Sequence, residues 1–334
     1  MSDMTIQSGP AINGLGSVVL ENKSLRVVVL PEAGAKVLQI HYKPLAADLL
    51  WNNPSLAPSR QPLHASYDDT WSGGWDELFP NDEAGELLGL GLPDHGELWT
   101  GEWQAERVDA GGETSLQMRF TTPVSHFAVE KRLALSRDHA VLKVHYRLTN
   151  RGEKPFPFLF KLHPAFAVTK NHRIDFPAMT VRRESEFAGT LEGAPLTFAW
   201  PDAQVGDHTV DLRQVPDEHS GEVHFFYGTE LAAGWCGMTN RTNRLAAGLR
   251  FDPEVFSSCW LFATYGGWRE LNVAVLEPAT GYPYKMQSML ENGQARWLAP
   301  EESLETAVLF SVQEGLSSVG GVEDDGNILP GNGG

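Results

Sequence analysis

Three titratable side chains stand where acid–base chemistry is common. His95 lies in a Pro-Asp-His-Gly sequence that is typical of a turn, while His163 and Glu277 each come at the end of an apolar run and directly precede a proline. Proline cannot donate to a strand ladder, so both runs are expected to stop pairing near these residues. One carboxylate and one imidazole are enough for a reaction that takes up one proton and releases another near neutral pH.

The two strand-end groups differ in the face that alternation assigns to them. Glu277 shares its face with Val273 and Val275. A carboxylate on an apolar face either is paired with a cation or has a raised pKa, and both are common at catalytic sites. A strand-end residue that reaches solvent would give the same pattern. His163 falls on the face of Lys161, so alternation does not bury it, and a solvated histidine fits equally well.

A further feature is the segment 71–103, which is too irregular for one plain strand. It combines four tryptophans with acidic, amide and imidazole groups: Trp71, Trp75, Trp99, Trp103, Asp76, Glu77, Asn81, Asp94, His95 and Glu97. Aromatic rings stack on the C–H faces of sugars, whereas carboxylates and amides bind sugar hydroxyls. The segment therefore predicts a carbohydrate site, although the same tryptophans would also suit a buried core. The expected sugar contacts are Trp75, Asp76, Asn81 and Trp99.

The elements that must position these residues are strands. Apolar and polar residues alternate over 116–121, 127–135 and 142–149, with a turn at 136–139, which predicts an antiparallel meander with one wet face. Similar runs extend to residue 312, and helical periodicity is almost absent. We therefore expect an all-β protein with one large β-sandwich domain over residues 1–316. The Gly-, Asp- and Asn-rich residues 317–334 are expected to form a disordered tail.

Charge and cysteine content exclude several classes of function. The chain has 26 basic and 43 acidic side chains, for a formal charge of −17, which would repel nucleic acid and anionic membrane surfaces. The two cysteines, Cys236 and Cys259, have neither a disulfide-framework nor a zinc-site spacing. No signal peptide or membrane-length apolar stretch is evident. We expect a cytoplasmic protein that binds a small molecule, and a homodimer is compatible with the sequence.

The chain resembles the aldose 1-epimerase (galactose mutarotase-like) family over about residues 20–312. The matching motifs are His95-Gly96 followed by Trp99, Leu162-His163-Pro164, and Leu276-Glu277-Pro278 with Thr280-Gly281. The resemblance implies a large single-domain β-sandwich, a sugar site on a concave sheet and no cofactor or metal. It also implies that Glu277 is the general base, that His163 is the general acid, and that His95 is a second histidine near the ring oxygen.

The sequence departs from the family's pattern at one place. Members that act on free hexoses carry a Gly-Arg and Asn-Arg pair upstream of the first histidine, where this chain has residues 73–81 without arginine. The identity of the sugar is therefore open. A hexose-phosphate epimerase needs cations for the phosphate, and Arg269 or Lys285 would have to supply them.

Two alternatives belong to other classes of protein. A non-catalytic carbohydrate-binding protein would use the same sandwich and the same tryptophans, but it would bind sugar without accelerating any reaction. A metal enzyme would use His95, His163 and Glu277 as ligands, although these residues lie far apart in the sequence and show no short metal-binding spacing.

Overall fold

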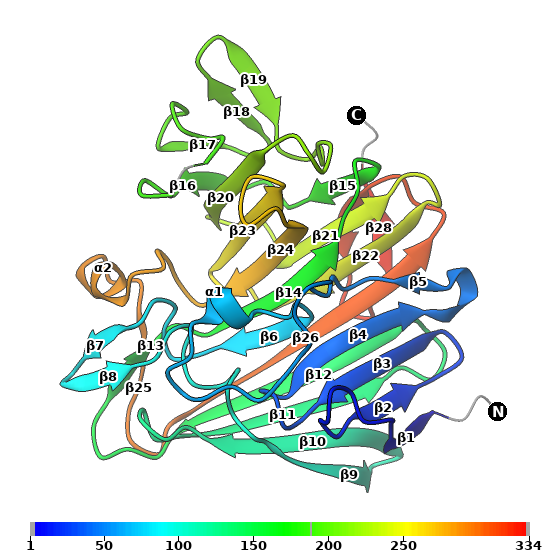
Figure 1. Cartoon of the computed structure of the whole chain (residues 1–334), viewed down its shortest axis with the longest axis vertical. Helices are drawn as coiled ribbons and strands as arrows, with labels where there is room; N and C mark the ends of the chain where they lie inside the picture. Colours follow the sequence, from blue (N-terminus) through cyan, green and yellow to red (C-terminus); the bar gives the residue numbers. More distant parts are fainter. Residues whose placement is uncertain (1–3, 188, 332–334) are drawn as a thin grey trace. The chain divides into compact units, whose positions relative to one another are not determined.

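A computed structural model of the chain describes residues 4–187 and 189–331 (Figure 1). These residues form 28 strands, two short α-helices and one 3-10 helix, so the all-β prediction is confirmed. The chain divides into two compact units. The first runs to Pro164 and includes Thr280–Ala307, while the second comprises Ala165–Ala279 and the residues from Val308 onward. That residues 1–316 form one domain stays a prediction.

The first unit contains strands of two antiparallel sheets. The strands of one sheet, in spatial order, are β1 (Thr5–Ser8), β2 (Val18–Glu21), β3 (Leu25–Leu30), β4 (Lys36–Tyr42), β6 (Trp75–Leu78) and β14 (Lys161–Ala167), with β5 (Ala47–Asp48) paired to β4. Those of the other are β9 (Gln104–Ala110), β10 (Glu113–Thr121), β11 (Phe127–Leu135) and β12 (Val141–Asn150). The smaller elements are β7 (Gly85–Leu87), β8 (Leu90–Leu92), β13 (Phe156–Phe158), β25 (Arg296–Leu298), η1 (Lys43–Leu45), α1 (Tyr67–Thr70) and α2 (Met286–Glu291). The chain passes to the second unit within β14 and again within β26 (Ser303–Glu314).

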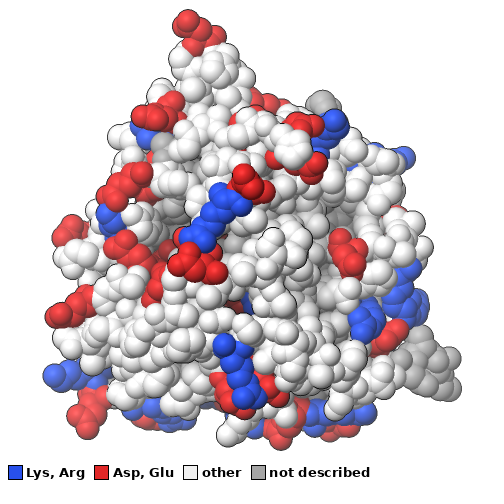
Figure 2. Space-filling view, in the orientation of Figure 1, with Lys and Arg blue, Asp and Glu red and all other residues white. Residues whose placement is uncertain are grey.

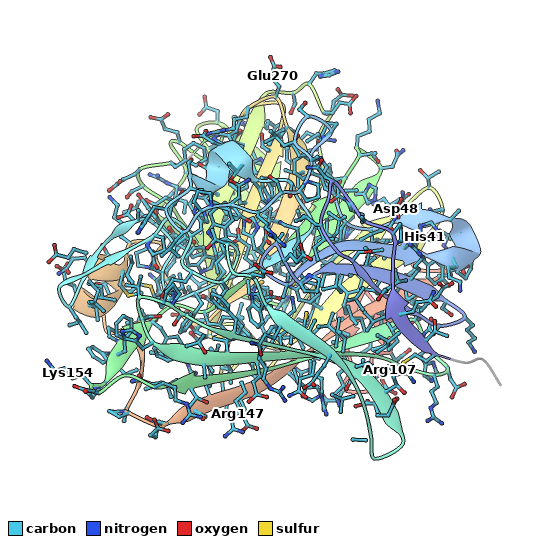
Figure 3. The ribbon with its side chains drawn as sticks, turned by 60° about the horizontal axis from the view of Figure 1, so that its bottom comes forward. His41, Asp48, Arg107, Arg147, Lys154 and Glu270 are labelled. Atoms are coloured by element: carbon cyan, nitrogen blue, oxygen red, sulfur yellow. The ribbon has the colours of Figure 1, made fainter. Side chains whose placement is uncertain are left out.

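Strands β10, β11 and β12 are the predicted meander. Leu116 pairs with Leu133, and Leu133 pairs in turn with Val144, so apolar side chains form continuous rows across one face. Arg107 on the edge strand β9 and Arg147 on β12 extend into solvent (Figure 3). At the edge of the other sheet, His41 and Asp48 lie side by side on paired strands, with 2.9 Å between Nδ1 and Oδ1 (Figure 3).

Lys131 is the polar residue that interrupts the apolar face of β11. Its side chain is fully buried, and Nζ lies 2.7 Å from Oε2 of Glu77 on β6. Tyr146 on β12 donates to Oε1 of the same carboxylate at 2.6 Å. Burial raises the pKa of Glu77, although the Lys131 charge opposes the rise. Removing Lys131 or Glu77 would leave the other charge buried and unpaired, so this triad ties the two sheets of the first unit together.

The second unit also contains strands of two antiparallel sheets. Those of one sheet, in spatial order, are β24 (Asn272–Ala279), β23 (Ser258–Tyr265), β20 (Glu222–Thr229), β16 (Thr180–Arg183) and β17 (Thr197–Ala199). Those of the other are β15 (His172–Asp175), β21 (Trp235–Asn240), β22 (Leu245–Arg250) and the end of β26. Two hairpins complete it: β18 (Asp202–Val205) with β19 (His208–Asp211), and β27 (Val319–Val322) with β28 (Ile328–Pro330).

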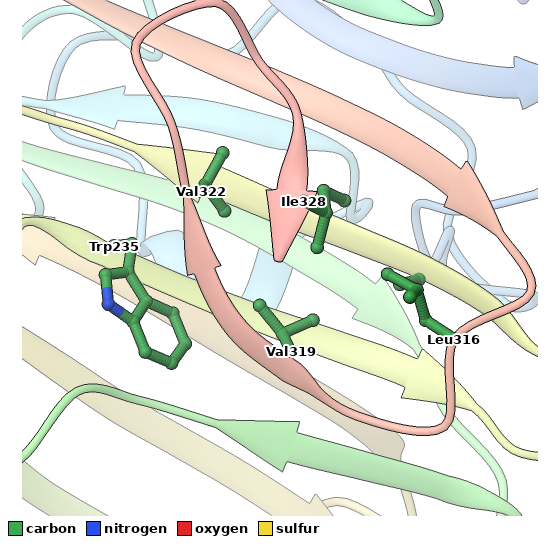
Figure 4. Packing of buried hydrophobic residues seen from close by; sticks show 6 residues of the cluster. Trp235, Leu316, Val319, Val322 and Ile328 are labelled. Carbon is green, nitrogen blue, oxygen red and sulfur yellow. The ribbon is translucent and has the colours of Figure 1, made fainter. Parts of the chain in front are cut away.

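The expectation that residues 317–334 are disordered is wrong for the described part of that segment. Strands β27 and β28 form a hairpin whose apolar side chains pack against β21 and β22 (Figure 4). The cluster comprises Trp235, Ala246, Leu316, Val319, Val322 and Ile328. Composition suggested disorder because glycine, aspartate and asparagine dominate, but three apolar residues of the hairpin, Val319, Val322 and Ile328, are enough to bury one of its faces. Residues 332–334 lie outside the described residues.

The surface carries both signs of charge. Basic and acidic side chains are interspersed on the face shown in Figure 2. No helix in the described ranges combines the length and the apolar character needed to cross a membrane.

Candidate active site

Tyr67 lies at the centre of a buried polar cluster in the first unit. It begins the short helix α1, where its backbone N–H donates to Oδ2 of Asp94 at 2.8 Å. Its ring stacks on His95, with 4.2 Å between centroids and 13° between planes, and meets His163 edge-on at 5.5 Å. Trp99 approaches the same ring edge-on at 5.0 Å. One phenol ring therefore holds both predicted histidines of the unit in fixed orientations.

His163 lies on β14, directly opposite Asp76 on β6. Its Nδ1 is 3.1 Å from the Tyr67 hydroxyl, and the edge of its ring contacts Trp71 at 5.3 Å between centroids. His163 is only 6% exposed, because β14 is covered on both faces from Lys161 onward. The alternative that His163 is exposed to solvent is therefore wrong. Alternation predicts exposure only where one face of a sheet is in contact with water.

The environment of His163 disfavours its charged form. Burial lowers the pKa of His163 well below its usual range, and the nearby charges of Lys161, His95 and Lys36 lower it further. Near neutral pH the imidazole is therefore uncharged.

Asp76 links the Tyr67 hydroxyl to a lysine. Its Oδ2 accepts from Nζ of Lys36 at 2.5 Å and from the Tyr67 hydroxyl at 2.9 Å, while Lys36 also donates to the carbonyl of Gly73 at 2.7 Å. Asp76 is fully buried, and its Oδ1 accepts no hydrogen bond from a described residue. The carboxylate predicted as a sugar contact thus uses one oxygen within the protein and has the other available.

His95 projects from a tight turn, as its sequence predicted. Its φ is 57° and that of Gly96 is 75°, and Asn81 donates to the carbonyl of Pro93 at 2.7 Å. A Cβ on Gly96 would lie 2.1 Å from the carbonyl oxygen of Phe79, so only glycine allows the turn to pack this closely against the end of β6. Asn81 therefore shapes the His95 turn through its amide.

Two carboxylates flank the His95 ring. Its Nδ1 lies 2.8 Å from Oδ1 of Asp94, and its Nε2 lies 3.9 Å from Oδ1 of Asp82. Burial alone would lower the pKa of His95, but the charge of Asp82 and the hydrogen bond to Asp94 outweigh it, so the pKa is raised. Asp82 is shared with Lys161, whose Nζ lies 2.5 Å from Oδ2.

The two tryptophans predicted to stack on sugar are buried in the protein. Trp75 has no exposed surface and lies opposite Val37 on β4 and Pro164 on β14. Trp99 is 6% exposed, and its indole N–H donates to the carbonyl of Asp94 at 2.9 Å. These positions favour the alternative role, in which both rings belong to the core that supports Tyr67.

Glu277 and Arg269 lie in the second unit. Glu277 is 1% exposed on β24, directly opposite Trp260 on β23, which in turn pairs with Tyr227 on β20. Arg182 on β16 pairs with Tyr227, so Arg182, Tyr227, Trp260 and Glu277 form one cross-strand row on the same face of this sheet. Arg269 is exposed, and its guanidinium lies 4.9 Å from the ring centroid of Trp268.

Comparison with known proteins identifies the family. The sequence model of the family described as aldose 1-epimerase matches residues 16–198, which is more than half of the chain. The chain belongs to the aldose 1-epimerase family. The match includes His95, His163 and all of the cluster around Tyr67, whereas Glu277 lies outside it. A search of curated proteins found no match.

Solved structures of low sequence identity share the fold of this aldose 1-epimerase family member. A Klebsiella pneumoniae protein provisionally named as an aldose 1-epimerase is 14% identical, with a TM-score of 0.71 over 93% of this chain and 84% of its own. An Escherichia coli K12 protein with the same provisional name is 18% identical, with a TM-score of 0.64 over 93% and 100%. A galactose mutarotase-like protein from Clostridium acetobutylicum is 13% identical, with a TM-score of 0.65 over 93% and 99%. These likenesses confirm the predicted galactose mutarotase-like fold.

Sequence reasoning found the histidines of this family member but missed the residues that hold them. Tyr67 stands in a polar stretch with no periodicity, and Lys36 and Asp82 carry no motif. Lys161 was recognised only as the neighbour of His163 on an expected solvent face. The one usable signal was the density of charged residues around the tryptophans of segment 71–103.

A metal site built on His95, His163 and Glu277 was one of the alternatives. Within residues 4–187 and 189–331, no set of three or more His, Cys, Asp or Glu side chains is arranged to hold a metal ion.

Proposed function

We propose that this chain interconverts the anomers of an aldose or aldose derivative by acid–base ring opening. The observation that carries the proposal is the pair of histidines on Tyr67. The pKa of His95 is raised because Asp82 and Asp94 outweigh the effect of burial, whereas burial and neighbouring cations lower the pKa of His163. Titratable groups whose pKa values are shifted by burial and neighbouring charges are typical of catalytic sites.

The reaction needs one proton acceptor and one proton donor. The acceptor removes the proton of the C1 hydroxyl, the C1–O5 bond breaks with its electron pair going to O5, and the donor protonates O5. Rotation about the C1–C2 bond followed by the reverse transfers closes the ring as the other anomer. Each general acid or base typically contributes about 10²–10⁴-fold, so no covalent intermediate or resident metal is required.

The proposed roles combine the resemblance with the burial of the groups. Glu277 is the proposed base for the C1 hydroxyl, a role supported by a carboxylate that is 1% exposed in an otherwise apolar strand. The histidine pair is the proposed source of the proton for O5, and the resemblance gives that role to His163 with His95 beside it. Asp76 is the proposed sugar contact through Oδ1, and Arg269 is a proposed contact for any anionic substituent.

The test is anomer exchange measured by NMR. Magnetisation transfer between anomers is followed with and without the full-length protein, over a panel of neutral, phosphorylated and sulfonated aldoses. We expect clear acceleration for at least one sugar, and a loss of roughly 10²-fold or more in His163→Asn. Saturable binding of a sugar without acceleration would instead favour a non-catalytic carbohydrate-binding protein.

The location and partners belong to the same proposal. Free, buried cysteines suit a reducing compartment such as the cytoplasm. A small sugar is the proposed ligand, with neither nucleic acid nor a membrane surface as partner, and a homodimer remains compatible with these features.

A further inference from the structure

A continuous chain of hydrogen bonds runs from a lysine to His163. Lys36 donates to Oδ2 of Asp76 at 2.5 Å, the Tyr67 hydroxyl donates to the same oxygen at 2.9 Å, and Nδ1 of His163 lies 3.1 Å from the Tyr67 oxygen. All four side chains are buried. Such a chain orders the protons of its members, because each hydroxyl has a single hydrogen to donate.

The direction of the protons follows from the charge on Asp76. Nζ of Lys36 donates to Oδ2 of Asp76, and a carboxylate paired with a lysine is a hydrogen-bond acceptor only. The single Tyr67 hydrogen is therefore committed to Asp76, because the alternative would bring two lone pairs together at 2.9 Å. The contact between Tyr67 and His163 then requires the imidazole to be the donor, through Nδ1–H.

We infer that Tyr67 is a positioning residue that fixes His163 in the Nδ1–H tautomer and leaves Nε2 as a bare proton acceptor. Among the described residues, the His163 side chain is hydrogen-bonded through Nδ1 to Tyr67 and not through Nε2, so Nε2 is available to a ligand. The meaning of this tautomer for catalysis rests on the proposed function, whereas the tautomer itself does not.

The same geometry makes His95 the proton donor of the pair. Asp94 accepts at Nδ1 and Asp82 lies near Nε2, so an imidazolium at His95 is stabilised on both sides. The charged groups that face His163 are Lys161, His95 and Lys36, and each of them disfavours a second proton on the imidazole. The carboxylate of Asp76 is linked to His163 through the Tyr67 hydroxyl. His95 would thus protonate O5 as the C1–O5 bond breaks, Glu277 would take the C1 proton, and Nε2 of His163 would accept only a hydrogen bond from the sugar, which reverses the roles that the resemblance gives to the two histidines.

The tautomer can be read directly from imidazole ¹⁵N shifts of the full-length protein labelled in histidine. Signals of His163 and His95 are assigned with His163→Asn and His95→Asn. We expect a neutral His163 at pH 7, with a protonated Nδ1 and a bare Nε2, while His95 loses its second proton at a higher pH than His163 does. A His163 protonated at Nε2 would overturn the inference.

Tyr67→Phe isolates the hydroxyl because it keeps the ring that stacks on His95. We expect the His163 signals to lose the pure Nδ1–H pattern. Tyr146→Phe is the matched control, since it removes another buried phenol bound to a carboxylate, and it should leave both histidine spectra unchanged. An unchanged His163 spectrum in Tyr67→Phe, or an equal change in both variants, would contradict the positioning role.

Kinetics on an accelerated sugar separate this inference from the proposed function. We expect Tyr67→Phe to lower kcat by roughly 10- to 100-fold with little change in KM, because a misplaced proton, rather than lost binding, limits the reaction. We expect the basic limb of the pH profile to disappear in His95→Asn and to persist in His163→Asn. If no sugar is accelerated while the spectra are as expected, the proposed function fails and the tautomer assignment stands. If sugars are accelerated but the basic limb follows His163, the role reversal fails and the proposed function stands.

Discussion

Two histidines that contact one tyrosine ring have opposite surroundings. His95 stands between the carboxylates of Asp94 and Asp82, whereas His163 is enclosed by apolar rings and faces cations. The difference arises from the chain around each residue. A turn with positive φ angles brings His95 to the acidic residues, while a strand covered on both faces buries His163.

This difference predicts opposite pH dependences of folding. Because the pKa of folded His163 lies well below that of the unfolded chain, unfolding takes up protons as the pH falls below about 6.5, and stability is lost there. His163→Asn should remove that loss, so the free energy of unfolding should decline less between pH 7.5 and 5.5 than in wild type. The limit for one group is about 1.4 kcal/mol per pH unit. Urea unfolding at both pH values measures it, and identical declines would contradict the assignment.

His95 provides the opposite control. Its folded pKa is raised, so its contribution to stability is complete below about 6.5 and is lost as the pH rises through the folded value. His95→Asn should therefore lose more stability at pH 5.5 than at pH 8. A uniform loss at both pH values would indicate that His95 is neutral in the folded protein.

At the scale of elements, the His95 turn depends on the absence of a side chain at Gly96. Gly96→Ala places a Cβ 2.1 Å from the backbone oxygen of Phe79 in addition to the cost of a positive φ, so we expect a loss of about 3 kcal/mol or more. Gly112→Ala has nearly the same φ, 78° against 75°, but no atom lies within 4 Å of its Cβ, and it should cost only about 1 kcal/mol. Chemical denaturation of both variants tests the comparison, and equal losses would mean that the turn does not need the close approach.

The C-terminal hairpin gives a second comparison of neighbouring residues. Ile328 is 1% exposed within the cluster of the second unit, whereas Leu329 is 40% exposed. Ile328→Ala should destabilise the protein by about 2–4 kcal/mol, because it removes buried methyl groups and leaves a cavity. Leu329→Ala should change stability by less than about 1 kcal/mol. Thermal or urea unfolding distinguishes them, and a negligible effect of Ile328→Ala would show that the hairpin is not part of the folded core.

These elements also show what the sequence could predict. The alternation over 116–149 predicted three strands and their antiparallel pairing, because a half-exposed sheet has a pattern of period two. It did not predict the burial of His163 and Lys161, since a strand covered on both faces loses that pattern. Tyr67 could not be identified, because its role depends on contacts with residues 9 and 96 positions away along the chain.

At the scale of the whole molecule, each compact unit contains some of the residues to which roles are proposed. The first supplies His95, His163 and Asp76, and the second supplies Glu277 and Arg269. The family match covers residues 16–198, so the role of Glu277 is the part of the account that depends most on experiment. The experiment must use the full chain, because neither unit alone contains all of the proposed groups.

The most direct measurement is the rate of anomer exchange in Glu277→Gln, by NMR on a sugar that the wild-type protein accelerates. Glutamine keeps the shape of the side chain and most of its hydrogen bonds but removes the base. We predict that turnover falls by roughly 10²-fold or more while sugar affinity and the unfolding midpoint stay close to wild type. Near-normal exchange in Glu277→Gln would contradict the account, because ring opening would then proceed without the carboxylate to which it assigns the C1 proton.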